Sequence, residues 1–238
     1  MPEARSQPPP TTPHQVPWLS WHPGLVGVIA FTVVVVPLLI SVWNMHTQAD
    51  RILRSTIQEH LLSAARVLAH SVDAETHQSL RDRSQEGSEG YQRILRNMES
   101  ARESIDSLRM IKFTYTCTQV GGQVRFVVDT TPSGDADHDG KDDKAHLMER
   151  YEHPSPSLLR VMEIGLPIVD QKPYTDRWGT FMSAYAPIFD GNRRMVGAAG
   201  VDMSLEDFEL QRSGLRHVAS LSALGVLFLG YLAGHGMA

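Results

Sequence analysis

The chain has 238 residues, with 22 Lys and Arg, 27 Asp and Glu, a formal net charge of -5 and one cysteine, Cys117. The absence of a basic excess disfavours a nucleic-acid binder, and a single cysteine excludes an intrachain disulfide. Outside the stretch from Asp50 to Arg216, the only charged residues are Glu3 and Arg5. Because a soluble protein spreads charge over its surface, two uncharged ends around a charged middle indicate a membrane-anchored chain.

The first uncharged end has two parts. Residues 1–20 are rich in Pro, Thr and Gln, which favours a disordered tail because such a segment buries too little apolar surface to fold. The apolar run from Pro23 to Trp43 would span roughly 30 Å as a helix, which matches a bilayer core. Residues 21–43 are therefore predicted to form a transmembrane helix. A cleaved signal peptide, the alternative, is normally shorter and follows a basic segment.

The second uncharged end, residues 216–238, holds a shorter apolar run. The segment from Val218 to Ala233 is marginal in length for a span, although Arg216 and His217 form a polar boundary before it. We predict a second transmembrane helix here, in a chain that is truncated soon after it. A buried C-terminal helix of the soluble domain is the alternative.

The spacing of apolar residues changes along the middle of the chain. Apolar residues at spacings of three and four predict a long helix over 44–82 and a second helix over 91–109. Two pairs of β-rich segments follow, and each pair is joined by a short Gly-containing turn, which is typical of a hairpin. Ser204 is expected to cap a final helix. Strands joined in hairpins form an antiparallel sheet, so the predicted class is α+β. The predicted strands are 111–120, 123–130, 180–189 and 194–203. A short helix is predicted at 156–164, between the two hairpins.

The order of four segments resembles a known family. In these segments an aromatic strand that ends in Ala-Pro-Ile is followed by a Gly-Val-Asp strand. Over residues 44–215 the chain resembles the extracytoplasmic Cache domains, also described as PAS-like periplasmic sensor domains. The segments that carry the resemblance are Phe126–Asp129, Tyr174–Thr180, Ser183–Ile188 and Val196–Met203.

The resemblance implies a fold, a location and a class of function. The expected fold is a long N-terminal helix packed on an antiparallel sheet, flanked by transmembrane helices. The expected location is the cell (inner) membrane, with the sensor domain at 44–215 outside the cytoplasm and the protein a homodimer. Such domains detect small molecules for sensor histidine kinases, nucleotide cyclases and chemoreceptors, whose output module this chain does not include.

A ligand pocket is predicted on the sheet. Aromatic residues alternate along the predicted strands, and a few polar side chains lie near the strand ends, where they can converge above the sheet. Arg125 or Arg177 could pair with a carboxylate. The alternative for each aromatic residue is ordinary core packing, since half-buried strands are rich in aromatics. The candidate ligand-binding residues are Tyr115, Arg125, Tyr174, Trp178, Ser183, Tyr185 and Asp202.

An acidic loop over residues 131–146 carries the beginning of a calcium-loop pattern. Asp135, Asp137 and Asp139 alternate before a glycine, and Asp143 follows, so several carboxylates could converge on one hard cation. The twelfth position is His146 instead of the usual bidentate Glu, which argues against an EF-hand. A looser calcium site and a solvated acidic loop both stay open, and with the first a calcium-dependent structural or adhesive module.

Motifs of catalysis are missing from the sequence. It has no Gly-rich phosphate loop, no nucleophile elbow and no HExxH pattern. His70 is not followed by the Glu and Pro expected after a phospho-accepting histidine. We therefore expect no enzyme in this chain, but a membrane-anchored sensory domain that binds a small molecule and passes a helix shift across the membrane. Any output enzyme would lie outside it.

Overall fold

The computed structural model describes residues 23–106, 110–135, 140, 142–210, 224–225 and 228. The chain divides into two units: Thr47–His217 is one, and Met1–His46 with Val218–Ala238 is the other. The predicted tail at 1–20 and nearly all of the predicted second span at 216–238 lie outside the described residues.

Helix α1 runs from Pro23 to Ser71 and includes Pro37. Within the described part of the chain, its portion Phe31–Ser71 is the one helix long and apolar enough to cross a membrane, by length and composition. Val33 and Ile40 in this portion are 66% and 55% exposed. Such exposure of aliphatic side chains on a long helix is consistent with the predicted anchor.

The predicted helix over 44–82 is interrupted in the structure. Helix α1 ends at Ser71, and Asp73 caps a separate short helix, α2 (Ala74–Ser79), by accepting the N–H groups of Glu75 and Thr76. An aspartate that bonds to the backbone in this way favours a helix start over a helix interior, which explains the interruption. A 3-10 helix, η2 (Arg83–Gly87), and helix α3 (Glu89–Ile105) follow.

The sheet confirms the predicted α+β class, because it is antiparallel and both expected hairpins are present. Its order is β2-β1-β6-β5-β3, and β4 also pairs with β5. The short strands β3 and β4 were not predicted, whereas helix α4 has the predicted bounds, with Ser155 as its N-cap. The elements are β1 (Phe113–Val120), β2 (Gln123–Asp129), α4 (Pro156–Ile164), β3 (Ile168–Val169), β4 (Tyr174–Asp176), β5 (Gly179–Phe189) and β6 (Met195–Ser204).

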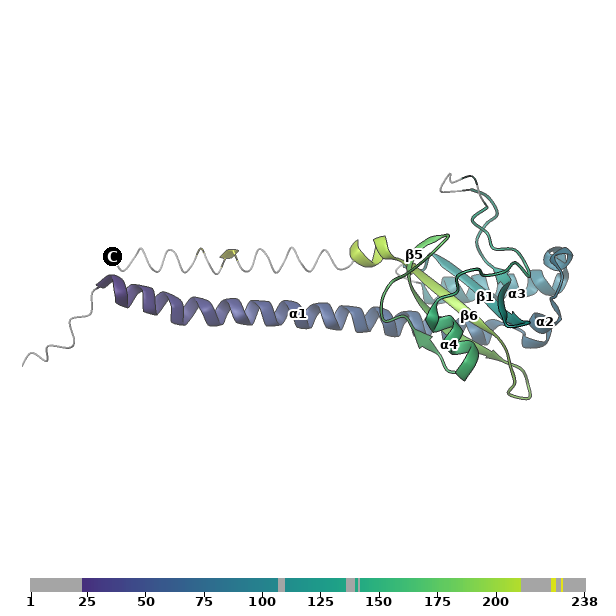
Figure 1. The fold of residues 1–238 in the computed structure, drawn as a ribbon, viewed down its shortest axis with the longest axis horizontal. Helices are drawn as coiled ribbons and strands as arrows, with labels where there is room; N and C mark the ends of the chain where they lie inside the picture. The colour runs from purple at the N-terminus through teal and green to yellow at the C-terminus, as the bar shows by residue number, and fades with distance from the viewer. Residues whose placement is uncertain are drawn as a thin grey trace, which may run out of the picture. The chain divides into compact units, whose positions relative to one another are not determined.

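Both faces of the sheet are covered (Figure 1). On one face, Leu61 and Leu68 of α1 belong to the main core cluster together with Val127 and Val201 of the sheet. A smaller cluster on the other face unites Tyr115, Cys117 and Phe126 of the sheet with α4 and with Ala145 and Tyr151. The long helix therefore packs on the sheet, as the sequence predicted, and leaves the second face for α4 and the segment before it.

Two glycines of β6 allow close contacts with β1. A Cβ atom on Gly197 would lie 2.4 Å from the Cys117 carbonyl oxygen and 2.7 Å from the His77 ring. A Cβ atom on Gly200 would lie 2.6 Å from the Tyr115 ring, so this ring lies directly on the β6 backbone. Because no other residue type leaves this space, the glycines determine how closely β1 and its side chains approach β6.

Candidate ligand pocket

A pocket lies on the α4 face of the sheet. It is formed by residues of β1, β2 and β6, by the segment 143–151 and by residues 176–178 before β5. Its cavity volume is about 20 Å³, which is room for about one water molecule. Ligand pockets typically measure about 300–1,000 Å³, so the walls of this one would have to move apart to admit a small molecule.

Aromatic rings form the apolar wall of the pocket: Phe113, Tyr115, Phe126, Tyr151 and Trp178. The ring centroids of Tyr115 and Phe126 are 5.4 Å apart, and Phe126 stacks on Tyr151 at 4.7 Å. Trp178 meets Phe126 and Tyr151 edge-on, at 5.3 and 5.8 Å. Since each ring restricts the orientation of its neighbours, the wall is already assembled without a ligand.

Asp202 of β6 is the most deeply placed carboxyl of the lining, with 4% of its surface exposed. The Tyr115 hydroxyl lies 3.4 Å from one of its oxygens, and the Ser183 hydroxyl also bonds to it. Burial raises the pKa of Asp202 to about 8, although the Ser183 bond opposes the shift, and the nearby Asp176 and Asp170 raise it further. The pocket therefore contains a buried acid whose ionised form has no opposite charge beside it among the described residues.

Asp129 and Asp176, two other carboxyl groups of the lining, hold the pocket together. Asp129 accepts hydrogen bonds from the N–H of Ala145 and from the Thr131 hydroxyl, both at 2.7 Å. Asp176 accepts one from the Tyr151 hydroxyl at 2.6 Å. Burial raises the pKa of Asp129, but the hydrogen bonds that it accepts oppose this shift. These acids have local partners that fix the walls.

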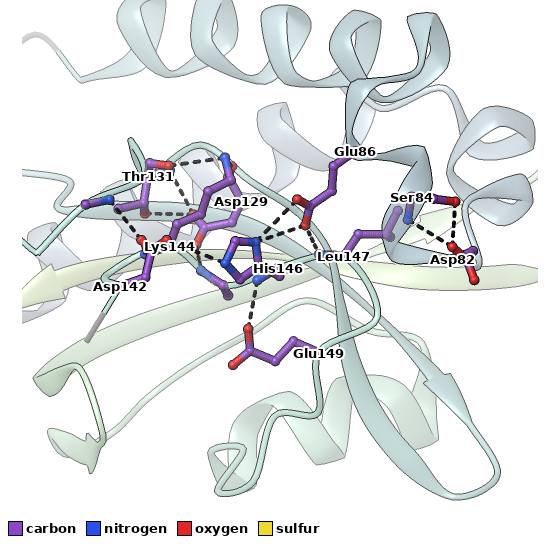
Figure 2. Close-up of polar contacts among 12 residues, drawn as sticks. Asp82, Ser84, Glu86, Asp129, Thr131, Asp142, Lys144, His146, Leu147 and Glu149 are labelled. Atoms are coloured by element: carbon purple, nitrogen blue, oxygen red, sulfur yellow. Dashed lines mark hydrogen bonds and ion pairs between the residues drawn. The ribbon is translucent and has the colours of Figure 1, made fainter. Parts of the chain in front are cut away.

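Residues 142–151 form a covering segment that contributes Asp143, Ala145 and Tyr151 to the lining of the pocket. Figure 2 shows polar contacts of part of this segment. The indole N–H of Trp178 donates to the Asp143 carbonyl at 2.9 Å. The Lys144 ammonium donates to the carbonyls of Asp129 and Thr131, at 2.9 and 3.2 Å. An irregular segment held at several points in this way can act as a structured wall.

The far side of the covering segment is tied to η2 through Glu86 (Figure 2). The Glu86 carboxylate accepts the N–H of the buried Leu147 and lies 3.2 Å from the His146 Nδ1 atom. The other ring nitrogen of His146 lies 3.5 Å from the Asp142 carboxylate. Glu86 thereby connects the wall of the pocket to the helical segments that follow α1.

Replacing Glu86 by alanine should loosen the covering segment. The buried Leu147 N–H would lose its acceptor, at a cost of about 1–3 kcal/mol, and local opening should accelerate amide exchange in residues 142–150 roughly 5- to 150-fold. Hydrogen exchange measured by mass spectrometry checks this. The control is Glu163→Ala on α4, whose exposed ion pair with Arg160 is worth little. Unchanged exchange in the Glu86 variant would show that Glu86 does not hold the segment.

The structure brings together some of the residues predicted to bind ligand. Tyr115, Trp178 and Asp202 line the pocket. Ser183 and Tyr185 are buried on the neighbouring strand β5, where Ser183 lies opposite Asp202 and bonds to it. They belong to the support of the pocket and not to its described lining.

Three predicted residues have other neighbours. Arg125 donates to the Met148 carbonyl at 2.8 Å, and the Tyr174 hydroxyl donates to the His153 carbonyl at 3.2 Å. Arg177 lies over the ring of Trp178, with its guanidinium carbon 3.9 Å from the ring centroid, and pairs with a glutamate of the covering segment. None of the three belongs to the described lining.

Sequence reasoning did not single out several lining residues. Phe126, Asp129 and Asp176 lie in segments that carry the family resemblance, so the resemblance marked the stretches but not the residues. Tyr151 lies in an irregular segment with no periodic pattern. Its position depends on long-range contacts, such as its N–H bond to the Val124 carbonyl.

The acidic loop falls only partly within the described residues. Asp137 and Asp139 of the tentative calcium set lie outside them. Asp135 accepts the N–H of Gly140 at 2.9 Å, and Asp143 belongs to the pocket lining. Among the described residues, no group of three or more His, Cys, Asp or Glu side chains is arranged to hold a metal ion.

Comparison with known proteins gave similarities in structure alone. No protein-family model matches the chain. No curated protein matches its sequence.

Similar solved structures include the methyl-accepting chemotaxis protein X, with 20% identity over 74% of this chain and a TM-score of 0.47. The ligand-binding domain of the Campylobacter jejuni chemoreceptor Tlp3 is similar in complex with L-valine (14% identity, 76% of this chain, TM-score 0.42) and with 4-methylisoleucine (16%, 80%, 0.40). The chain spans 67% of the first structure and 64% of each of the others.

Proposed function

We propose that this chain is a membrane-anchored sensory domain that binds a small molecule and acts by binding instead of turnover. The observation that carries the proposal is the pocket itself: an aromatic wall already assembled around the buried carboxyl of Asp202. A core that only needed stability would gain from an apolar side chain in place of a buried acid. The family resemblance of residues 44–215 supports the same function.

The position of Asp202 supports a route for the signal. Two residues after Asp202, strand β6 ends at Ser204, whose hydroxyl accepts the N–H of Asp207 and so begins a helical turn at 205–210. In this turn the buried Phe208 packs beneath the guanidinium of Arg54 from α1, which lies 5.7 Å from the ring centroid. A ligand that favoured one position of β6 would thereby favour one arrangement of this turn on α1.

The remaining parts of the proposal concern the membrane and the partner. The segment at 21–43 would anchor the chain in the cell (inner) membrane, with residues 44–215 outside the cytoplasm. A homodimer would bring two copies of α1 together, so that a shift of the helix could be passed on to an output module. The apolar composition of α1 supports the anchor.

A thermal-shift screen of the full chain in detergent micelles tests the proposal. Amino acids, small carboxylates, amines and uncharged compounds are the probes. A ligand at 100 times its Kd stabilises by about 2.7 kcal/mol, which raises the melting temperature of a domain of this size by roughly 5–10 °C. Trp178→Ala should abolish this shift, because it removes one wall of the pocket.

The control variant is Phe189→Ala, which truncates a 48% exposed aromatic residue at the end of β5, away from the pocket lining. This variant should keep the full ligand-induced shift. A screen without a stabilising compound, or with compounds whose effect persists in Trp178→Ala, would contradict the proposed function.

A further inference from the structure

We propose that helix α2 is an acid-sensitive clamp: protonation of His77 releases α2 from strand β6 and, through Glu86, loosens the covering segment of the pocket. The release itself needs no ligand, whereas its use as a control of the pocket rests on the proposed function. The position of the His77 ring, its lack of hydrogen-bond partners and the connection from α2 to Glu86 each support the clamp.

The His77 side chain anchors α2 to the sheet. Of the six described residues of α2, it alone is buried, with none of its surface exposed. Its ring lies on Gly197 of β6, so close that a Cβ atom on this glycine would lie 2.7 Å from a ring carbon. An aliphatic side chain could also bury apolar surface here, but only an imidazole gains a charge in mildly acidic solution.

Neither ring nitrogen of His77 has a hydrogen-bond partner among the described residues. The neutral ring carries one N–H donor and one acceptor, whereas the protonated ring would place two N–H donors and a positive charge in this buried position. Burying an unpaired charge costs more free energy than burying an uncharged polar group. The docked position of α2 therefore accepts the neutral ring and disfavours the protonated one.

The acids on α2 do not bind the ring. Asp73 caps α2 and pairs with Arg93 of α3 at 3.1 Å, and Glu75 is exposed. At the contact with the ring, residues 196–198 of β6 carry no ionisable group. The nearby strand β1 contributes Cys117, whose side chain belongs to the cluster on the other face of the sheet. A protonated His77 would therefore have no carboxylate partner among these groups.

Arg81 follows α2 and is the one charged group among the described residues that acts on the protonation of the ring. Burial, and to a smaller extent the Arg81 cation, lower the pKa of His77 from 6.5 to about 4. Between these two values a released ring takes up a proton, whereas the docked ring stays neutral. Docking of α2 should therefore weaken as the pH falls, by roughly 10- to 30-fold between pH 7 and pH 5.

Glu86 connects the clamp to the pocket. Three residues after α2 ends, η2 begins, and it carries Glu86. The Glu86 carboxylate accepts the N–H of Leu147 and lies beside the His146 ring, both in the covering segment (Figure 2). Once α2 is released, η2 is no longer fixed from that side, so the hold of Glu86 on the covering segment should weaken with it.

Hydrogen exchange of the full chain in detergent micelles, measured by mass spectrometry at pH 7 and pH 5, tests the clamp. After correction for the intrinsic exchange rate, protection of α2 should fall roughly 10- to 30-fold at pH 5. Protection of residues 142–150 should fall at the same time. His77→Leu should remove both changes, because leucine takes up no proton. Glu86→Ala should keep the change in α2 and remove the change in the covering segment.

Two further variants leave the His77 ring in place. Arg81→Gln removes the neighbouring cation, so the loss of protection in α2 should begin at a higher pH than in the wild type. The control is His70→Gln, an exposed histidine of α1 whose replacement should leave the acid response unchanged. These variants test the clamp even if His77→Leu does not fold.

Protection of α2 that is equal at both pH values, or an acid response that persists in His77→Leu, would overturn the clamp. An equal loss of protection throughout the sheet would also overturn it, because that result means global unfolding. A covering segment that stays protected while α2 opens would overturn the connection through Glu86. All of these results leave the proposed function intact, whereas a thermal-shift screen without a stabilising compound contradicts the proposed function and leaves the release of α2 standing.

Discussion

Replacing Asp202 by asparagine should raise the melting temperature of the ligand-free protein, and the gain should grow with pH. The pKa of this carboxyl is about 8 in the folded chain, against an ordinary value of 3.8. Between these values the unfolded chain ionises at Asp202 while the folded chain keeps the proton. The wild-type protein therefore loses stability as the pH rises from about 4 to 8, and a neutral asparagine does not.

The size of this effect follows from the linkage. Each pKa unit corresponds to about 1.4 kcal/mol, so the gain from Asp202→Asn should reach several kcal/mol above pH 8. Melting curves at pH 5, 7 and 9 measure it, with the exposed Glu75→Gln as a control that should show no such trend. A variant that is destabilised equally at all three pH values would show that Asp202 is held in its charged form by the fold. A group that lowers stability in this way is expected where a protein maintains it for a function.

Gly197→Ala should be strongly destabilising. The added methyl group would lie 2.4 Å from the Cys117 carbonyl oxygen, which is fixed in the sheet, and 2.7 Å from the buried His77 ring. Forcing β1 and β6 apart should cost on the order of 2–3 kcal/mol. Urea denaturation measures the loss, and it should appear as a lower midpoint at an unchanged slope.

The matched control is Gly191→Ala in the β5–β6 turn. A Cβ atom there meets nothing within 4 Å, so its effect should stay within about 0.5 kcal/mol. Equal effects of the two substitutions would mean that the close approach at Gly197 does not constrain the sheet.

Local chemistry made much of the fold predictable. Helix α4 has its predicted bounds because Ser155, Pro156 and Gly165 form a complete set of start and stop signals, with Gly165 at a φ of 64°. The hairpins follow from turns whose residues accept positive φ, such as Gly121 and Gly122. These signals act over a few residues, so the sequence displays them directly.

Tertiary contacts determined the rest. The two-residue strand β3 pairs only through Ile168 and Val169 with β5, too short a run to produce a periodic pattern. The break between α1 and α2 arises from one cap at Asp73 within a continuing apolar stripe. In the site, Tyr115 was expected from strand alternation and Asp202 from its place near a strand end, and both line the pocket. The sequence pattern could not show that the Arg125 guanidinium would bond to the covering segment, because that segment is irregular.

The single cysteine of the chain has a consequence for observing this protein at work. Cys117 lies on β1 beneath the pocket, is completely buried, and its thiol has a pKa raised by that burial. A thiol reagent can reach it only while β1 is uncovered, and the neutral thiol reacts slowly even then. Because the thiol reacts slowly, the rate of alkylation reports the equilibrium population of the open sheet. A bound ligand that closes the pocket should lower this rate.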